Sequence, residues 1–387
     1  MANLGICLLI CLSLSACAST KIANMDTSGT FELFDDEARL WKRSKELEDI
    51  LNKSGYIYQD EQLTKYVNDV LHKVTSELEA SNKVNLKVYI LKDPFFNAFC
   101  LPDGVIYVHT SILANADNEA QLATLLGHEA SHFFCRHSLK EQRSIINKSA
   151  FLSALSVTLT GTGGYGSLAD ILAQYVVVGS VFGYSRGLEN EADKKGFELM
   201  EKAGYDPKEA KKFLENLYEA NKDDDKIPYF YSTHPTTKAR VKSCEKLISG
   251  FSKENNGEIG GVINDNIYNK MIKNVLLDNA ELDLTRQKGI KTARRQIEKY
   301  NTLYPGDSRA YCLLGKSYIL ENNKAKAEEI FKKSLEFNPS YAQAHRELGL
   351  LYYKDGKKED ARIEFKEYLR LKPDAEDDEY IRRYLDG

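Results

Sequence analysis

The residues in this chain that say most about chemistry are the run His-Glu-Ala-Ser-His at positions 128–132. At about 100° per residue, His128 and His132 lie about 40° apart on one face of a helix, one turn above each other. Two imidazoles placed this way can both direct a nitrogen at one ion, which suits tetrahedral zinc. Glu129 lies beside the first ligand and can reach a water on the metal without binding the metal itself. Since zinc lowers the pKa of its water towards about 7, the pattern favours metal-activated hydrolysis with Glu129 as the base.

A third metal ligand has to come from elsewhere in the chain. The apolar residues before the motif recur at helical spacing, so we expect a buried helix whose polar side chains need partners. The longer motif with a Gly and a third His downstream is absent, because Cys135 and Ser138 stand at those positions. Glu189 and Asp193 offer two carboxylates at i and i+4 of a second expected helix. One could complete the site while the other orients a ligand imidazole, although this spacing alone favours a solvated acidic face.

The combination of His-Glu-x-x-His with a later Ser-Arg-x-x-Glu-x-Glu-Ala-Asp, at residues 185–193, resembles the gluzincin family of CAAX-protease-like and HtpX-like zinc metallopeptidases. Within that family the chain is most similar to the BepA-type periplasmic proteases with C-terminal tetratricopeptide repeats. The resemblance implies one Zn²⁺ per chain, with Glu189 as the third ligand and Asp193 in a supporting role. It also implies an α+β fold, in which a mainly helical metallopeptidase domain with a small β-sheet beside the cleft precedes an all-α repeat domain.

A further element of this family, Thr-His-Pro followed by a basic residue, is present as residues 233–235 and Arg240. For BepA-like members the resemblance implies that the histidine, here His234, can take the open zinc position and keep the enzyme latent. In other members the His and the Arg stabilise the tetrahedral intermediate, so His234 and Arg240 are also candidate catalytic residues. The sequence leaves both roles of His234 open, the gate and the oxyanion donor.

Residues 97–108 are expected to form two short strands around a Pro-Asp-Gly turn, because β-branched and aromatic residues flank that turn. The family has a similar Asn-Ala-Phe…Pro-Gly-Gly segment at the sheet edge beside the active-site cleft. An extended peptide can add to such an edge through backbone hydrogen bonds. Asp103 departs from the family, where Gly is more common, and this leaves the turn type open.

Two neighbours of the motif are weaker candidates. His137 lies five positions after His132, about 140° round a continuous helix, so we expect it to face away from the metal in a structural or surface role. Cys135 is three positions after His132 and could approach zinc, but the match at Glu189 makes a thiolate ligand the weaker interpretation.

The first seventeen residues resemble a bacterial lipoprotein signal. An apolar run from Leu4 to Ala16 is too short for a bilayer, which needs about 20 residues, and it is followed by Cys17 as the residue to be lipidated. Residues 1–6 lack Lys and Arg, which leaves an ordinary secretion signal or a wrongly assigned start as the alternatives. Ala18 gives no retention signal of the Asp type, so we expect a lipid anchor in the outer membrane that faces the periplasm.

Composition argues against two other classes of protein. The net charge of −4 and the pI of about 6.1 provide no basic field of the kind that binds nucleic acid. Three of the seven cysteines belong to the signal or its end, and the other four lack the spacing of a metal site: Cys100, Cys135, Cys244 and Cys312. A disulfide-stapled scaffold is therefore excluded, although one incidental bridge is compatible with the sequence.

The length of the chain fits two or three domains. Residues 31–80 have helical periodicity and are expected to pack on the catalytic core. Residues 150–183 are apolar and broken by glycines, so we expect a buried helix pair or a lid over the cleft in preference to membrane insertion. A polar link near residues 250–261 separates a metallopeptidase domain over residues 30–250 from a second domain over residues 262–387.

The second domain contains a repeat of 34 residues. The positions that recur are, in the first copy, Tyr311, Leu314, Gly315, Tyr318, Ala327, Phe331 and Pro339. Their spacing resembles tetratricopeptide repeats, and a weaker third copy precedes them. Each unit buries its apolar face only by stacking on its neighbours, so three units are about the minimum. The concave face is expected to bind a protein partner, and a structural cap on the protease domain is the alternative.

The main hypothesis is a lipid-anchored, zinc-dependent endopeptidase that hydrolyses unfolded or misassembled envelope proteins as part of periplasmic quality control. Zinc is held by His128, His132 and Glu189, while Glu129 acts as general base and then as proton donor to the leaving amine. The rival hypothesis is an assembly factor or chaperone for outer-membrane proteins, in which the repeats do the essential work and the protease site is latent.

Overall fold

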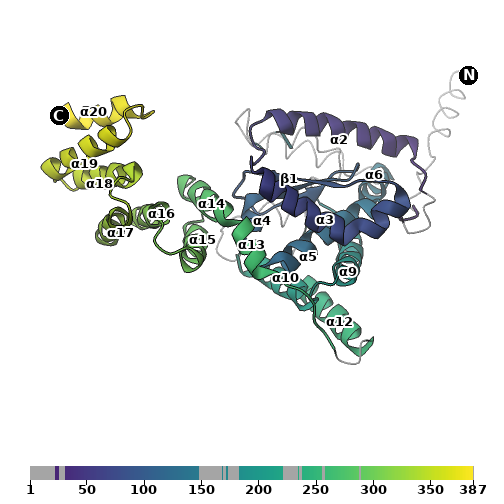
Figure 1. Ribbon diagram of the computed structural model, residues 1–387. Coiled ribbons are helices and arrows are strands. Elements are labelled where there is room, and N and C mark those ends of the chain that lie inside the picture. Colours follow the sequence, from purple (N-terminus) through teal and green to yellow (C-terminus); the bar gives the residue numbers. More distant parts are fainter. Residues whose placement is uncertain are drawn as a thin grey trace, which may run out of the picture.

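The computed structural model describes residues 22–25, 31–147, 168, 171–172, 183–220, 234, 238–254, 258–286 and 289–386. Figure 1 shows a broad helical body around a small sheet and an arm of paired helices that leads from it to the C-terminus. The predicted signal with Cys17 lies outside the described residues, as do most of residues 150–183. No helix in the described part of the chain has both the length and the apolarity of a membrane span.

The body of the molecule is mainly helical with one small sheet, and an all-helical arm follows it, so the predicted α+β class is confirmed. The elements of the body are α2 (Asp35–Lys53), α3 (Glu61–Asn82), β1 (Lys87–Leu91), β2 (Ala98–Cys100), β3 (Val105–His109), α4 (Thr110–Asn115), α5 (Glu119–Phe134), α6 (His137–Asn147), α9 (Arg186–Lys202), α10 (Lys208–Ala220) and α12 (Lys238–Glu254).

The sheet contains the strand pair that residues 97–108 predict. Strand β3 lies in the middle, parallel to β1 and antiparallel to β2, so β2 is an edge strand. The turn between β2 and β3 closes with a hydrogen bond from the Gly104 amide to the Leu101 carbonyl at 3.0 Å. Gly104 has a φ of 92°, which an L-residue rarely adopts. Asp103 is compatible with this turn because its buried carboxylate forms an ion pair with Lys45 at 3.4 Å.

Helix α5 runs through the centre of the body and is buried along nearly its whole length. It begins where the Asn118 side chain accepts a hydrogen bond from the Gln121 amide at 3.0 Å, an N-cap that satisfies one free backbone donor. Apolar side chains on α5, including Leu122 and Leu126, join those of α3 and α9 in one core. The motif helix is therefore fixed on several sides by neighbouring helices.

Helix α2 covers the other face of the sheet. Leu47 and Leu51 are fully buried against Phe99 and Tyr107 of the strands. Leu168 and Leu172 are buried in the same cluster. The expectation of a lid or buried helix pair over residues 150–183 otherwise falls outside the described residues.

The arm consists of helix pairs, as the 34-residue repeat predicts. Its elements are α13 (Asp265–Met271), α14 (Lys273–Thr285), α15 (Ile290–Leu303), α16 (Ser308–Leu320), α17 (Lys324–Phe337), α18 (Ala342–Lys354), α19 (Lys358–Leu371) and α20 (Asp378–Asp386). Helix α16 packs on α17 as α18 packs on α19. In each pair an aromatic ring packs directly against a glycine of the partner helix. Phe331 packs against Gly315, and Phe365 packs against Gly349.

The first helices of the arm continue the core of the body. The fully buried Tyr268 of α13 donates a hydrogen bond to the Leu113 carbonyl at 2.7 Å. Tyr58 donates to the Asp278 carboxylate of α14 at 2.6 Å. One apolar cluster extends from α3 and α5 through α14 and α15 to α16. The division into domains near residues 250–261 stays a prediction.

Candidate metal centre

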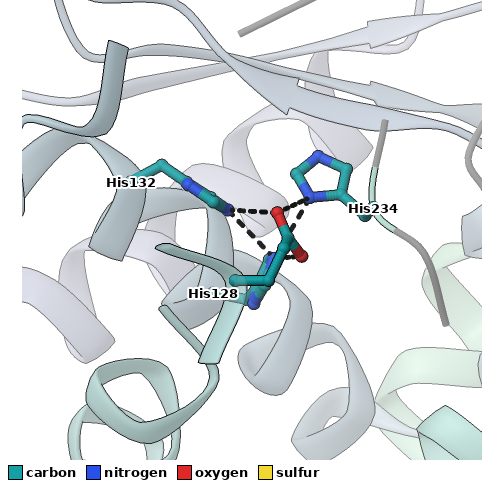
Figure 2. A group of neighbouring side chains, drawn as sticks. His128, His132 and His234 are labelled. Carbon is teal, nitrogen blue, oxygen red and sulfur yellow. Dashed lines mark hydrogen bonds and ion pairs between the residues drawn. The ribbon is translucent and has the colours of Figure 1, made fainter. Parts of the chain in front are cut away.

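Helix α5 brings the two motif histidines to one point. Their Nε2 atoms lie 3.1 Å apart, and His128, Glu129 and His132 are all buried. Figure 2 shows the imidazoles of His128 and His132 converging from neighbouring turns of the helix. The i, i+4 geometry predicted from the sequence is therefore present.

Helix α9 adds the carboxylate of Glu189 to this pair. Its Oε2 lies 3.6 Å from the His128 Nε2, and its Oε1 lies 3.5 Å from the His132 Nε2. The approach depends on two glycines at the crossing of α5 and α9, because a Cβ on Gly196 would lie 2.7 Å from the His128 amide nitrogen. The matching Cβ on Gly127 would lie 2.9 Å from the Gly196 carbonyl oxygen.

His234 comes from a distant part of the chain and closes the cluster. Its Nδ1 lies 3.0 Å from the Glu189 Oε1 and 3.4 Å from the His128 Nε2. Its Nε2 lies 3.7 Å from the Glu129 Oε1. His128, His132, Glu189 and His234 each offer one ligand atom within 4.8 Å of all the others. The three histidines of this group are labelled in Figure 2.

The polar atoms of this cluster fit a bound cation. Both carboxylate oxygens of Glu129 and the Oε2 of Glu189 are buried without a hydrogen-bond partner in the described structure. Leaving such atoms unpaired is costly. Imidazole nitrogens together with one carboxylate are a donor set that zinc accepts. A divalent cation would compensate the buried carboxylate charge.

Asp193 and Arg240 form a layer behind His128. The His128 Nδ1 lies 3.0 Å from the Asp193 Oδ1, so the imidazole can donate to this carboxylate while its Nε2 faces the cluster. Arg240 of α12 grips the same carboxylate with two hydrogen bonds, at 2.8 Å and 2.5 Å. It also lies 3.4 Å from the Glu189 Oε2. Asp193 thus lies behind His128 and Arg240 lies next to the cluster, while the supporting role of Asp193 and the catalytic role of Arg240 stay predictions.

This geometry agrees with the comparison to known families. The family model described as Peptidase family M48 matches residues 61–248, which contain the cluster and the layer behind it. Residues 61–248 belong to peptidase family M48. A second model, described as Tetratricopeptide repeat, matches residues 308–341 in the arm, which agrees with the predicted repeat.

Curated relatives of the M48 domain come from bacteria and mitochondria. The chain is 32% identical over 48% of its length to "Mitochondrial metalloendopeptidase OMA1" of Schizosaccharomyces pombe, of which the match covers 53%. It is 27% identical over 49% of its length to "Beta-barrel assembly-enhancing protease" of Escherichia coli K12, of which the match covers 40%. It is also 29% identical over 46% of its length to "Metalloendopeptidase OMA1, mitochondrial" of Homo sapiens, of which the match covers 35%. The chain thus spans about half or less of these relatives.

The helical path expected for His137 is wrong, because α5 does not continue to it, although His137 does lie outside the four-residue cluster. Helix α5 ends at Phe134, and Arg136 has a φ of 55°, so the chain turns back. His137 begins α6, is fully buried, and places its Nδ1 2.9 Å from the Nδ1 of His132. The expected rotation of 140° applied to a continuous helix, and the helix is not continuous there.

The His132 ring has further contacts that the sequence did not predict. Tyr184 stacks on it with 4.0 Å between ring centroids, and the Tyr184 hydroxyl lies 2.9 Å from that of Ser138. Neither Gly nor Pro marks the end of α5, so no local signal announces the turn. The nearest clue is Arg136, whose buried ion pair with Glu37 of α2 holds the left-handed residue in place.

Burial and charge set the protonation of the M48 cluster. Burial lowers the pKa of His132 well below its usual value and lowers that of His137 to about 4. Burial alone would raise the pKa of the Glu189 carboxyl, but the charges on His234 and Arg240 outweigh this and lower it. The pKa of Asp193 is likewise held down against burial, mainly by Arg240. A neutral His132 beside ionised carboxylates is what a divalent cation requires of its ligands.

Cys135 is buried but does not belong to the four-residue cluster. Burial raises the pKa of its thiol to about 12, so the thiol is protonated at neutral pH. In the described part of the chain its metal-capable neighbours are His137 and Glu191, on the far side of His132. The weaker interpretation of Cys135 as a ligand of the main cluster therefore gains no support.

Proposed function

We propose that the chain is a zinc-dependent endopeptidase whose metal is held by His128, His132 and Glu189. The observation that carries this proposal is the convergence of two imidazoles and a carboxylate beside the fully buried carboxylate of Glu129, whose oxygens have no hydrogen-bond partner in the described structure. When bound, Zn²⁺ supplies Lewis-acid activation of a water molecule and of the peptide carbonyl. Glu129 takes the proton of the attacking water and delivers it to the leaving amine.

Strand β2 is the proposed docking edge for the substrate. It is one of the two edge strands of the sheet in the described residues, and it contacts α5. Helix α5, which β2 contacts, carries the general base Glu129. An extended peptide paired to this edge is held through its backbone, which suits substrates of varied sequence.

His234 is proposed as a fourth metal ligand that keeps the site latent. Its Nδ1 lies among the ligand atoms, and its Nε2 faces Glu129 at 3.7 Å. A ring in this position takes the space that an attacking water needs. Arg240, held by Asp193, is then a candidate for stabilising the oxyanion once His234 has moved.

The proposed substrates are unfolded or misassembled envelope proteins in the periplasm. Support comes from the similarity to the beta-barrel assembly-enhancing protease of Escherichia coli and from the predicted lipid attachment at Cys17 to the outer membrane. The tetratricopeptide repeat matched at residues 308–341, together with the neighbouring helix pairs, suggests a surface for a protein partner.

A second candidate function is that of an assembly factor whose protease site stays closed. The position of His234 within the cluster favours it, because a closed site leaves the repeats as the active part of the molecule. The two functions differ in whether hydrolysis is needed. Full-length protein with Glu129→Gln should fail to support envelope assembly if hydrolysis is required, and should support it if the protein acts as a chaperone.

The decisive experiment compares wild type and Glu129→Gln, each alone and with His234→Ala to open the site. Glu129→Gln should retain one zinc per chain and lose hydrolysis of casein, an unfolded model substrate. In the His234→Ala background, where no fourth ligand can take its place, Glu189→Ala should lose bound zinc. Full hydrolysis by the Glu129→Gln protein would remove the mechanism, and stoichiometric zinc in Glu189→Ala with His234→Ala would remove the ligand assignment.

A further inference from the structure

A chain of hydrogen-bonding groups lies behind His132, on the side away from the cluster. The His137 Nδ1 lies 2.9 Å from the His132 Nδ1, and the His137 Nε2 lies 3.2 Å from the Glu191 Oε2. The His137 side chain is fully buried. Helix α9 therefore contributes Glu191 behind one histidine and Asp193 behind the other.

Counting the protons on the two imidazoles shows which group donates and which accepts in each hydrogen bond of this series. A metal at the cluster needs the lone pair of the His132 Nε2, so the proton of a neutral His132 sits on its Nδ1. Two Nδ1 atoms 2.9 Å apart can share only one proton, so His132 donates and His137 accepts. The proton of His137 is then on Nε2, where it is donated to the Glu191 carboxylate. Each tautomer follows from its neighbour.

Glu191, the last group of this hydrogen-bonded series, is held by the segment at residues 22–25. The Asn24 amide donates to the Glu191 Oε1 at 2.7 Å, and Lys140 donates to the Asn24 Oδ1 at 2.8 Å. The Met25 amide donates to the Phe134 carbonyl at the end of α5, at 2.7 Å. The Glu191 carboxylate is thus held by Asn24 on one oxygen and by His137 on the other.

We propose that His137 is a positioning residue, which together with Glu191 selects the tautomer and the ring orientation with which His132 binds zinc. This inference rests on the proposed function, because it assigns a partner to one of the proposed ligands. A partner of this kind raises the basicity of the ligand and limits its rotation. His137 touches neither the metal position nor a substrate in this arrangement.

A rival use of the same residues is a second metal site. Cys135, His137 and Glu191 offer ligand atoms within 4.8 Å of one another. Two observations favour the hydrogen-bonded chain instead. The Lys140 ammonium lies 3.4 Å from the Glu191 Oε2, where it would oppose a second cation. Both oxygens of Glu191 already have partners, since Oε2 lies 3.2 Å from the His137 Nε2 and Oε1 accepts a hydrogen bond from the Asn24 amide at 2.7 Å.

The test measures the dissociation constant of zinc in the full-length protein by competition with a chelator. His137→Phe, which keeps a ring but removes both nitrogens, should weaken zinc binding by about 10- to 100-fold. His137→Gln, which can still accept from His132 and donate to Glu191, should recover most of that loss. The control His109→Gln changes another buried histidine, one that contacts the Phe95 carbonyl, and should leave zinc affinity unchanged.

A second variant covers the case in which His137→Phe does not fold. Glu191→Gln keeps the shape of a half-exposed side chain and should weaken zinc binding in the same direction by a smaller factor. With Co²⁺ in place of zinc, it should also shift the visible absorption bands, which report the ligand field at the metal. Identical Co²⁺ absorption bands in the wild type and in Glu191→Gln would contradict the proposed hydrogen-bonded connection from Glu191 through His137 to His132.

Three results would overturn the proposal. One is zinc affinity in His137→Phe within twofold of wild type, and another is a His137→Gln protein as weak as His137→Phe. The third is two zinc ions per chain, one of them lost in Cys135→Ser, which would show the rival site. If the wild-type and His234→Ala proteins both bind zinc but neither cleaves casein, the proposed function is removed. The expected order of zinc affinities among the His137 and Glu191 variants would be unaffected by that result.

Discussion

At the scale of single residues, one short stretch of α9 places three carboxylates beside the imidazoles of His128, His132 and His137. Glu189 lies at the Nε2 atoms, while Asp193 lies behind His128. Glu191 lies two residues from both Glu189 and Asp193 and points to another side of the helix. It has an imidazole partner because the turn after α5 places His137 beside it. Neighbouring acidic side chains thus have different electrostatic surroundings, and each is paired with a different group.

The role of His234 can be decided by removing its ring. If the ring gates the site, His234→Ala should retain zinc through the other ligands and hydrolyse casein faster than wild type. A gain of about tenfold would correspond to a site that is open about a tenth of the time in the wild type. Zinc content and initial rates measure both effects.

The opposite result would assign His234 to the oxyanion. Loss of a donor to the transition state costs on the order of 10²-fold or more in rate. His72→Ala is a suitable control, because His72 lies on α3 with a partly exposed side chain that pairs with Glu79. Its rate should equal that of the wild type.

The parts of the site that follow a helical period were predictable, and the part that depends on a chain reversal was not. His128 with His132, and Glu189 with Asp193, are i, i+4 pairs whose shared face requires only that a helix forms. His137 reaches His132 through the turn at Arg136, which depends on the tertiary ion pair with Glu37. Only the folded structure supplies that partner.

At the scale of elements, the close crossing of α5 and α9 joins the two halves of the metal cluster. Helix α5 carries the histidines and α9 carries Glu189, so the distance between the helices sets the ligand distances. Gly127 and Gly196 face each other at this crossing without side chains between them. Any added atom there has to push the helices apart or distort them.

Gly196→Ala should therefore lower both stability and zinc affinity. The new Cβ would lie 2.7 Å from the His128 amide nitrogen, and a backbone atom cannot yield as a flexible side chain can. Overpacking of this kind costs about 1–3 kcal/mol, of which the better helix propensity of Ala offsets a part. Unfolding in denaturant and zinc competition measure the two quantities.

The matched control for this prediction is on the same helix. A Cβ on Gly187 meets no atom within 4 Å, so Gly187→Ala should leave zinc affinity unchanged and stabilise the helix by up to about 1 kcal/mol. Equal zinc affinity and stability in Gly196→Ala and Gly187→Ala would show that the crossing does not set the ligand distances.

The repeat helices show how far a sequence period can lead. The 34-residue spacing predicted the pairs α16–α17 and α18–α19, because glycine and phenylalanine recur where the two helices of a pair touch. The 34-residue period does not predict which helix is the first of the stacked helix pairs. Helices α13 and α14 pack on α3, α4 and α5 through contacts such as that of Tyr268 with Leu113, which no periodic pattern encodes.

At the scale of the whole molecule, the arm and the body share one apolar core, so we expect them to depend on each other for stability. The shared core extends from α5 to α16, and Figure 1 shows α13 and α14 lying where the arm leaves the body. A cut at residue 261 would expose the body surface that Tyr268 and its neighbours cover. Point substitutions in the full-length chain are therefore a better probe of this junction than a truncation.

Tyr268→Ala tests this dependence directly. Its fully buried ring and its hydrogen bond to the Leu113 carbonyl are both lost, and a change of this size costs about 3–5 kcal/mol. Ile267, the preceding residue of α13, is 53% exposed, so Ile267→Ala should cost less than about 1 kcal/mol. Because the core is shared, Tyr268→Ala should lower the temperature at which zinc is released along with that of helix melting. If zinc release stays at the wild-type temperature while only part of the helical signal melts early, the M48 domain and the arm are energetically independent.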